Sequence, residues 1–192
     1  MTRIVVLISG HGSNLQALID AQQRDELGGG QIVAVLSNRA EAFGLKRAQQ
    51  ANIPAEHLSH RDFAEREAFD AALMRRIDNY QPDLIVLAGF MRILTPAFVQ
   101  HYAGKMVNIH PSLLPKYPGM HTHARAIEAG DQEHGASVHF VTEGVDEGPV
   151  ILQGRAPILA DDTPDTLQQR VHVLEHQLYP RAVRMICEQN PT

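Results

Sequence analysis

The chain has 192 residues, of which 44% are hydrophobic and 20% charged, with a net charge of -5 at pH 7. This composition argues against a disordered chain, and the length suits one domain over residues 1–192 but is cramped for a second compact unit. The negative charge and the lack of a basic run argue against general binding to nucleic acid or anionic membranes. The single cysteine excludes an internal disulfide, and no apolar stretch approaches the ~20 residues that span a bilayer, so we expect a cytoplasmic protein.

A strand, a glycine turn and a helix open the chain. Residues 4–8 are apolar at every position, which is typical of a strand buried on both faces of a parallel sheet. The turn at residues 9–14 follows, and Leu15, Leu18 and Ile19 then recur at helical spacing. We expect Ser13 or Asn14 to cap this helix.

The rest of the N-terminal half, about residues 1–100, alternates strands with helices. We expect strands at residues 32–36, 53–58 and 84–88, and helices at about 40–51 and 62–80. Such alternation requires parallel pairing through right-handed crossovers. The pattern predicts an α/β fold: a Rossmann-like, doubly wound, mostly parallel sheet with helices on both faces.

The C-terminal half, about residues 101–192, completes the sheet in this prediction. A strand at 106–109 leads into a proline-rich loop at 111–119, which proline makes stiff, and one of its prolines is a candidate for a cis bond. A helix at about 122–129, strands at 136–141 and 150–159, and a final helix from residue 163 follow.

The glycine turn lies where ligands gather in a parallel sheet, at the carboxyl end of a strand. Its backbone amides and the following helix dipole suit an anion such as a phosphate. The turn is not a P-loop, because the Gly-Lys-Ser/Thr ending is missing, nor a dinucleotide fingerprint, because Leu15 stands where the third glycine belongs. A tight turn that merely needs glycine remains the alternative.

A polar centre follows the predicted strand at 106–109. Period-two alternation points Asn108 and His110 the same way, offering an oxyanion donor and a proton carrier. Asp146, in a glycine-rich loop, would orient His110 if it reaches it, which sequence spacing cannot decide. Turn roles for Asn108 and Asp146, and a core role for His110, stay open. The 11 histidines match no standard zinc spacing, so we expect no metal.

Along almost its whole length the chain resembles a known family, the folate-dependent phosphoribosylglycinamide formyltransferases. The matching segments are residues 6–16 (VLISGHGSNLQ), 86–94 (VLAGFMRIL), 108–115 (NIHPSLLP), 134–142 (HGASVHFVT) and 146–151 (DEGPVI). The segment at 108–115 is specific for folate formyl transfer but not for one acceptor. The glycine loop and the absence of additional domains favour the phosphoribosylglycinamide enzymes over their relatives.

The resemblance implies roles for individual residues. The catalytic set is Asn108, His110 and Asp146. The substrate-binding residues are Gly12, Ser13, Asn14, Leu15, Gln16, His172, Val173, Leu174 and Glu175. The folate-binding residues are Arg66, Met91, Arg92, Ile93, Leu94, Asn108, Thr142, Glu143, Gly144, Val145 and Asp146.

The reaction that the resemblance implies is formyl transfer from 10-formyltetrahydrofolate, as co-substrate, to the amine of 5-phosphoribosylglycinamide in purine biosynthesis. Transfer would be direct, through a tetrahedral intermediate, with His110 as general acid/base, Asn108 as oxyanion donor and Asp146 orienting His110. Two alternatives stay open: a formyltetrahydrofolate deformylase or other folate formyltransferase, and a non-catalytic phosphometabolite-binding protein. We expect no nucleic-acid or membrane partner, and the long helices leave a homodimer open.

Overall fold

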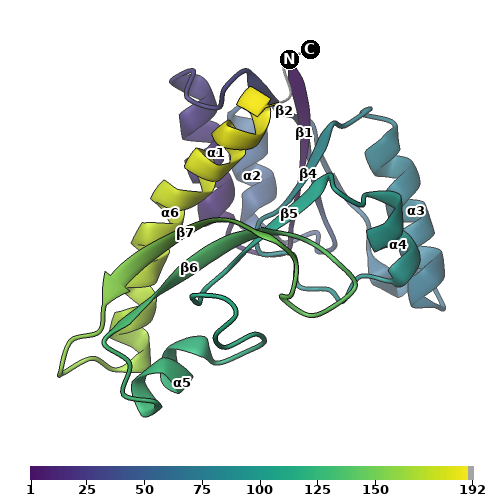
Figure 1. Cartoon of the computed structure of the whole chain (residues 1–192). Coiled ribbons are helices and arrows are strands. Elements are labelled where there is room, and N and C mark those ends of the chain that lie inside the picture. The colour runs from purple at the N-terminus through teal and green to yellow at the C-terminus, as the bar shows by residue number, and fades with distance from the viewer. Residues whose placement is uncertain (190–192) are drawn as a thin grey trace.

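The computed structural model describes residues 1–189 and is built around one seven-stranded sheet (Figure 1). The strand order is β3-β2-β1-β4-β5-β6-β7. The strands are β1 (Thr2–Ile8), β2 (Gly30–Ser37), β3 (Ala55–His57), β4 (Leu84–Leu87), β5 (Met106–His110), β6 (Glu133–Phe140) and β7 (Val150–Pro157). The first five pair in parallel, whereas β6 and β7 are antiparallel to their neighbours. The predicted mostly parallel α/β sheet is confirmed.

Helices cover both faces of the sheet (Figure 1). On one face α1 (Ser13–Gln23), α2 (Phe43–Gln50) and α6 (Pro164–Gln189) share a core cluster with Ile4, Val6 and Ile8 of β1. On the other face α3 (Arg66–Asp78) and α4 (Pro96–His101) pack on Val5 and Leu7. The uninterrupted apolar run of β1 therefore reflects burial of alternate side chains on opposite faces.

The strand order reverses beside β1, because β2 extends the sheet to one side and β4 to the other. At such a switch point the crossovers diverge and leave a crevice at the carboxyl ends of the strands. The glycine turn follows β1 at this edge, and β4 and β5 end beside it. The topology thus brings the glycine turn and the polar residues of β5 to the same edge.

Two helix starts differ from the prediction. Residues 60–62 form a separate 3-10 turn, η1 (His60–Asp62), in which the Ser59 hydroxyl accepts a hydrogen bond from the Arg61 amide. Phe63 then returns to extended backbone, so α3 begins only at Arg66. In the same way, α2 begins at Phe43 after the extended Ala42. Both segments look helical by composition, and the local turns that shorten the helices leave no periodic signal.

The proline-rich loop leads from β5 to α5 (Thr122–Glu128). Its Leu114–Pro115 peptide bond is cis, which identifies the proline that the sequence left open. Within the part of the chain that the structure describes, no helix combines the length and hydropathy that a membrane crossing requires.

Candidate functional site

The turn between β1 and α1 depends on Gly12. Its φ is 79°, in the left-handed region, and a Cβ there would lie 2.8 Å from Gly44 Cα. Glycine is therefore required both for the backbone conformation and for the close approach of α2. The prediction that Ser13 or Asn14 caps α1 is wrong. The N-cap residue is Gly12, and no side chain forms a hydrogen bond to cap the helix. Because Ser13 and Asn14 already lie within the first helical turn, their side chains are not used as caps.

A cavity of about 360 Å³ opens at the carboxyl ends of β1, β4 and β5. The glycine turn, residues 88–91 and Asn108 form one part of its lining, and His172 and Glu175 of α6 form another. Predicted substrate residues from the two ends of the chain are thus brought together.

Glu175 is a buried carboxyl group at this cavity, with 6% of the residue exposed. Its burial raises its pKa from 4.5 to about 7, although the hydrogen bond from Asn14 acts in the opposite direction. Asn14 Nδ2 donates to Glu175 Oε1 at 3.2 Å, while Asn14 Oδ1 is buried without a hydrogen-bond partner. The pair therefore offers acceptor oxygens to a ligand that carries hydroxyl or amine groups.

Asn108 and His110 project from the same side of β5, as predicted. Val107 and Ile109 belong to the core under α1 and α6, so strand alternation directs Asn108 and His110 to the opposite side. Asn108 lines the cavity, whereas His110 is buried, with 5% of the residue exposed. His110 Nε2 lies 2.8 Å from the carbonyl oxygen of Tyr117. A carbonyl only accepts, so Nε2 donates to it, and Nδ1 is the ring nitrogen left for other contacts.

Asp146 reaches His110. Its Oδ2 lies 3.3 Å from His110 Nδ1 and also accepts a hydrogen bond of 2.9 Å from the Gly119 amide. The backbone of Asp146 has a φ of 52°, in the left-handed region, and this turns the residue back toward the proline-rich loop. A proton on Nδ1 would therefore lie between imidazole and carboxylate, an arrangement suited to acid-base chemistry.

A second histidine flanks the same carboxylate. His139 of β6 pairs with Asn108 across the sheet, and its Nε2 lies 3.8 Å from Asp146 Oδ1. Burial lowers the pKa of His139, and its Nε2 has no hydrogen-bond partner. Burial thus favours a neutral imidazole beside Asp146.

Comparison with known families gives a match along almost the whole chain: residues 2–183 match the family model described as formyl transferase. The chain belongs to this family. It is 58% identical to the phosphoribosylglycinamide formyltransferase of Escherichia coli (strain K12) over 185 residues, which is 96% of this chain and 87% of that protein. It is also 55% identical to the trifunctional purine biosynthetic protein adenosine-3 of Drosophila melanogaster, over 96% of this chain and 14% of that protein.

Solved structures of the same family share the fold. A phosphoribosylglycinamide formyltransferase from Coxiella burnetii is 55% identical with a TM-score of 0.93, over 98% of this chain and 88% of the other. A glycinamide ribonucleotide transformylase from Symbiobacterium toebii is 44% identical with a TM-score of 0.94, over 98% of this chain and 89% of the other. The chain is therefore a formyltransferase of the α/β type.

Not every residue that the family resemblance assigns to the substrate lines the cavity of this formyltransferase. Leu15 is fully buried in the core, so only its backbone is available to a ligand. Gln16 Oε1 accepts a hydrogen bond of 3.2 Å from Arg47. On α6, Val173 is 60% exposed and Leu174 packs beside Gly154, whereas His172 and Glu175 face the cavity.

The formyltransferase resemblance assigns three parts of the chain to the folate. These are residues 91–94, residues 142–146 and Arg66 at the start of α3. Met91 and Ile93 are 71% and 73% exposed, and they flank Arg92, whose guanidinium lies 4.2 Å from the centre of the Phe69 ring. Leu94 packs on the core between the sheet and α3. Arg66 is exposed at the first position of α3.

The second folate segment, residues 142–146, follows β6. Thr142 is exposed, and Glu143 Oε1 accepts a hydrogen bond of 2.7 Å from Gln100 Nε2. A Cβ on Gly144 would lie 2.2 Å from Glu147 Oε2, and Val145 is 69% exposed. Apolar side chains that are this exposed on both segments are available to contact an apolar ligand.

Sequence reasoning missed three groups at the site. The Tyr117 carbonyl holds His110, His139 flanks Asp146, and Ser9 Oγ accepts a hydrogen bond of 2.7 Å from the Met91 amide. A backbone carbonyl leaves no trace in a sequence. For His139 a signal existed, because the pairing of β5 with β6 sets it opposite Asn108. Residues that lie opposite each other in a sheet point to the same face.

Proposed function

We propose that the chain transfers the formyl group of 10-formyltetrahydrofolate to the amine of 5-phosphoribosylglycinamide. The observation that carries the proposal is the His110–Asp146 pair, joined at 3.3 Å beside a cavity that Asn108 and the glycine turn line. Family membership and the names of the similar proteins support the same reaction.

The acceptor lies in the cavity at the glycine turn. Its phosphate meets the backbone amides at the start of α1, where the helix dipole favours an anion although the chain has a net charge of -5. The proposed contacts are Gly12, Ser13, Asn14, the backbone of Leu15, and Gln16. Glu175 and the unpartnered Asn14 Oδ1 accept hydrogen bonds from the polar groups of the acceptor.

The formyl donor lies between residues 91–94 and 142–146, with Arg66 near its acidic end. Exposed apolar side chains on both segments contact the pterin, and the backbone of the loop provides hydrogen bonds. The donor and acceptor then meet at Asn108, which both sites share.

The chemistry requires no covalent bond to the protein. The amine nitrogen attacks the formyl carbon, and the carbonyl oxygen becomes negative in a tetrahedral intermediate, which the Asn108 amide stabilises by donating to that oxygen. The former amine loses a proton, the folate nitrogen gains one, and its bond to the formyl carbon breaks. His110 Nδ1, supported by Asp146, moves this proton through water, and bringing both substrates together supplies much of the rate.

We further propose that residues 1–192 form one formyltransferase domain in the cytoplasm, with no nucleic-acid or membrane partner. All described strands join one sheet, which supports a single domain whose halves meet near residue 100. Among residues 1–189, no group of three or more potential metal ligands gathers. The reaction as written uses no metal.

The test measures release of tetrahydrofolate from 10-formyltetrahydrofolate, with and without 5-phosphoribosylglycinamide, for the wild type and His110→Ala. We expect release that depends on the acceptor and falls by at least about a hundredfold in the variant. Release that ignores the acceptor would identify a deformylase. An absence of release with this acceptor would refute the proposed reaction, and binding of the acceptor without turnover would indicate a phosphometabolite-binding protein.

A further inference from the structure

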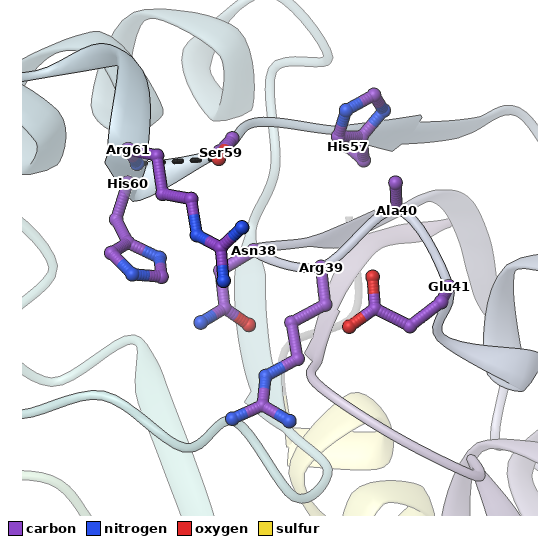
Figure 2. Close-up of a pocket in the computed structure, with 8 residues that line it drawn as sticks. All are labelled: Asn38, Arg39, Ala40, Glu41, His57, Ser59, His60 and Arg61. Carbon is purple, nitrogen blue, oxygen red and sulfur yellow. Dashed lines mark hydrogen bonds between the residues drawn. The ribbon is translucent and has the colours of Figure 1, made fainter.

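A second cavity, of about 480 Å³, lies at the carboxyl ends of β2 and β3, on the same edge of the sheet as the first (Figure 2). We call it the Arg39–Arg61 cavity. Two arginines and two histidines line it, against one carboxylate; these residues are Arg39, His57, His60, Arg61 and Glu41. Basic side chains thus outnumber acidic ones in its lining.

The basic groups of this cavity lack protein partners. Among the described residues, the side chains of Arg39, Arg61, His57 and His60 form no hydrogen bond or ion pair. The contrast with nearby Arg76 is informative, since Arg76 pairs with Glu56 at 2.7 Å. Figure 2 shows that the side chains of Arg39, His60 and Arg61 extend to the same side of the cavity. Unpaired arginine forks that gather in this way suit a ligand with several carboxylate or phosphate groups.

A buried amide adds a fixed donor to the cavity. Asn38 is 5% exposed, and its Oδ1 accepts a hydrogen bond of 2.6 Å from Ser9 Oγ. This bond sets the orientation of the amide, so that Nδ2 presents its N–H groups away from Ser9. Nδ2 forms no hydrogen bond within the described chain and is available to an acceptor in the cavity.

One hydrogen-bond relay and one chain connection link this cavity to the segment at 91–94. The Ser9 hydroxyl that orients Asn38 also accepts a hydrogen bond of 2.7 Å from the Met91 amide. Arg92 stacks on Phe69 of α3, and only residues 63–65 separate α3 from the 3-10 turn that carries His60 and Arg61. A ligand seated against residues 91–94 could therefore extend an anionic end along this edge into the Arg39–Arg61 cavity.

We propose that the Arg39–Arg61 cavity binds the poly-γ-glutamyl extension of the folate co-substrate. This inference rests on the proposed function. Each added γ-glutamyl residue brings one further carboxylate on a flexible chain, which matches several separated cationic groups better than a single ion does. A cavity of about 480 Å³ is in the size range of small-molecule sites.

The experiment compares 10-formyltetrahydrofolate carrying one or three glutamyl residues. For the wild type we expect the triglutamyl form to have a KM about three- to tenfold lower, since exposed ion pairs each contribute modestly. Arg39→Ala/Arg61→Ala should bring the two KM values together without changing kcat or the KM of the monoglutamyl form. The Lys/Lys variant at the same positions should keep most of the preference, and added salt should weaken it.

Arg155→Ala is the matched control, because Arg155 is an exposed arginine on β7, at the opposite edge of the sheet. It should leave the preference intact. Equal KM values in the wild type, or a preference that survives in the double alanine variant, would overturn the inference while leaving monoglutamyl turnover and the proposed function standing. Binding of inorganic phosphate that the double variant abolishes, without any glutamyl preference, would reassign the cavity to a free phosphate and overturn it too. A wild type that turns over neither form would refute the proposed function instead.

Discussion

Replacing Glu175 by glutamine should stabilise the folded protein in a way that depends on pH. Glu175 is a buried carboxyl group on α6 whose pKa burial raises from 4.5 to about 7. Glutamine keeps the size of the side chain and an acceptor oxygen for Asn14, and it replaces the ionisable oxygen with an uncharged NH2 group. The variant therefore isolates the free energy of placing a carboxylate in this environment.

The magnitude follows from the linkage between proton binding and folding. Below about pH 4.5 both the folded and the unfolded chain hold the proton, so the carboxyl group does not favour unfolding. As the pH rises toward about 7, the unfolded chain releases the proton first, and the folded state loses stability. Each tenfold difference in proton affinity is worth about 1.4 kcal/mol, so a pKa rise from 4.5 to about 7 costs the wild type about 3 kcal/mol.

The assay is urea unfolding of the wild type and Glu175→Gln at a series of pH values. The two proteins should be similar in stability near about pH 4.5, and the variant should gain most of about 3 kcal/mol by about pH 8, or roughly 6–12 °C in melting temperature. Glu188→Gln on the same helix is the control, because Glu188 is half-exposed and paired with Arg184, so that it should add no comparable dependence on pH. A difference between the wild type and Glu175→Gln that does not change with pH would refute the reasoning.

Two further substitutions test the site and its support. Asp146→Asn keeps an acceptor for the Gly119 amide but removes the charge beside His110 Nδ1. The kcat should fall by about a hundredfold or more at an almost unchanged melting temperature. Unchanged turnover would remove Asp146 from the proposed scheme. Tyr179→Phe removes a fully buried hydroxyl that donates to the Leu87 carbonyl at 2.7 Å; the free energy of unfolding should fall by about 1–2 kcal/mol in urea titrations, and an unchanged value would mean that the bond contributes nothing net.

The fold was predictable from the sequence because its strongest signals are local. An apolar run such as residues 4–8 is a strand buried on both faces, and alternation with helices leaves few topologies. The helix starts at Phe43 and Arg66 were less accessible, since the turns at residues 39–42 and 59–63 depend on backbone hydrogen bonds rather than on periodicity. The cis bond at Pro115 likewise depends on its surroundings, because three prolines of the loop were equal candidates.

The candidate site was predictable only as separate parts. Strand alternation places Asn108 and His110 on one side of β5, but Asp146 lies 36 positions beyond His110 in the chain, and nothing in that spacing brings it back. Three features of the folded chain do so: the antiparallel pairing of β5 with β6, the left-handed backbone of Asp146, and the Gly119 amide that binds its carboxylate. Tyr117 and Gly119, which hold His110 and Asp146 respectively, belong to the same proline-rich loop. The loop therefore positions both members of the pair, and its prolines restrict the backbone that carries these two contacts.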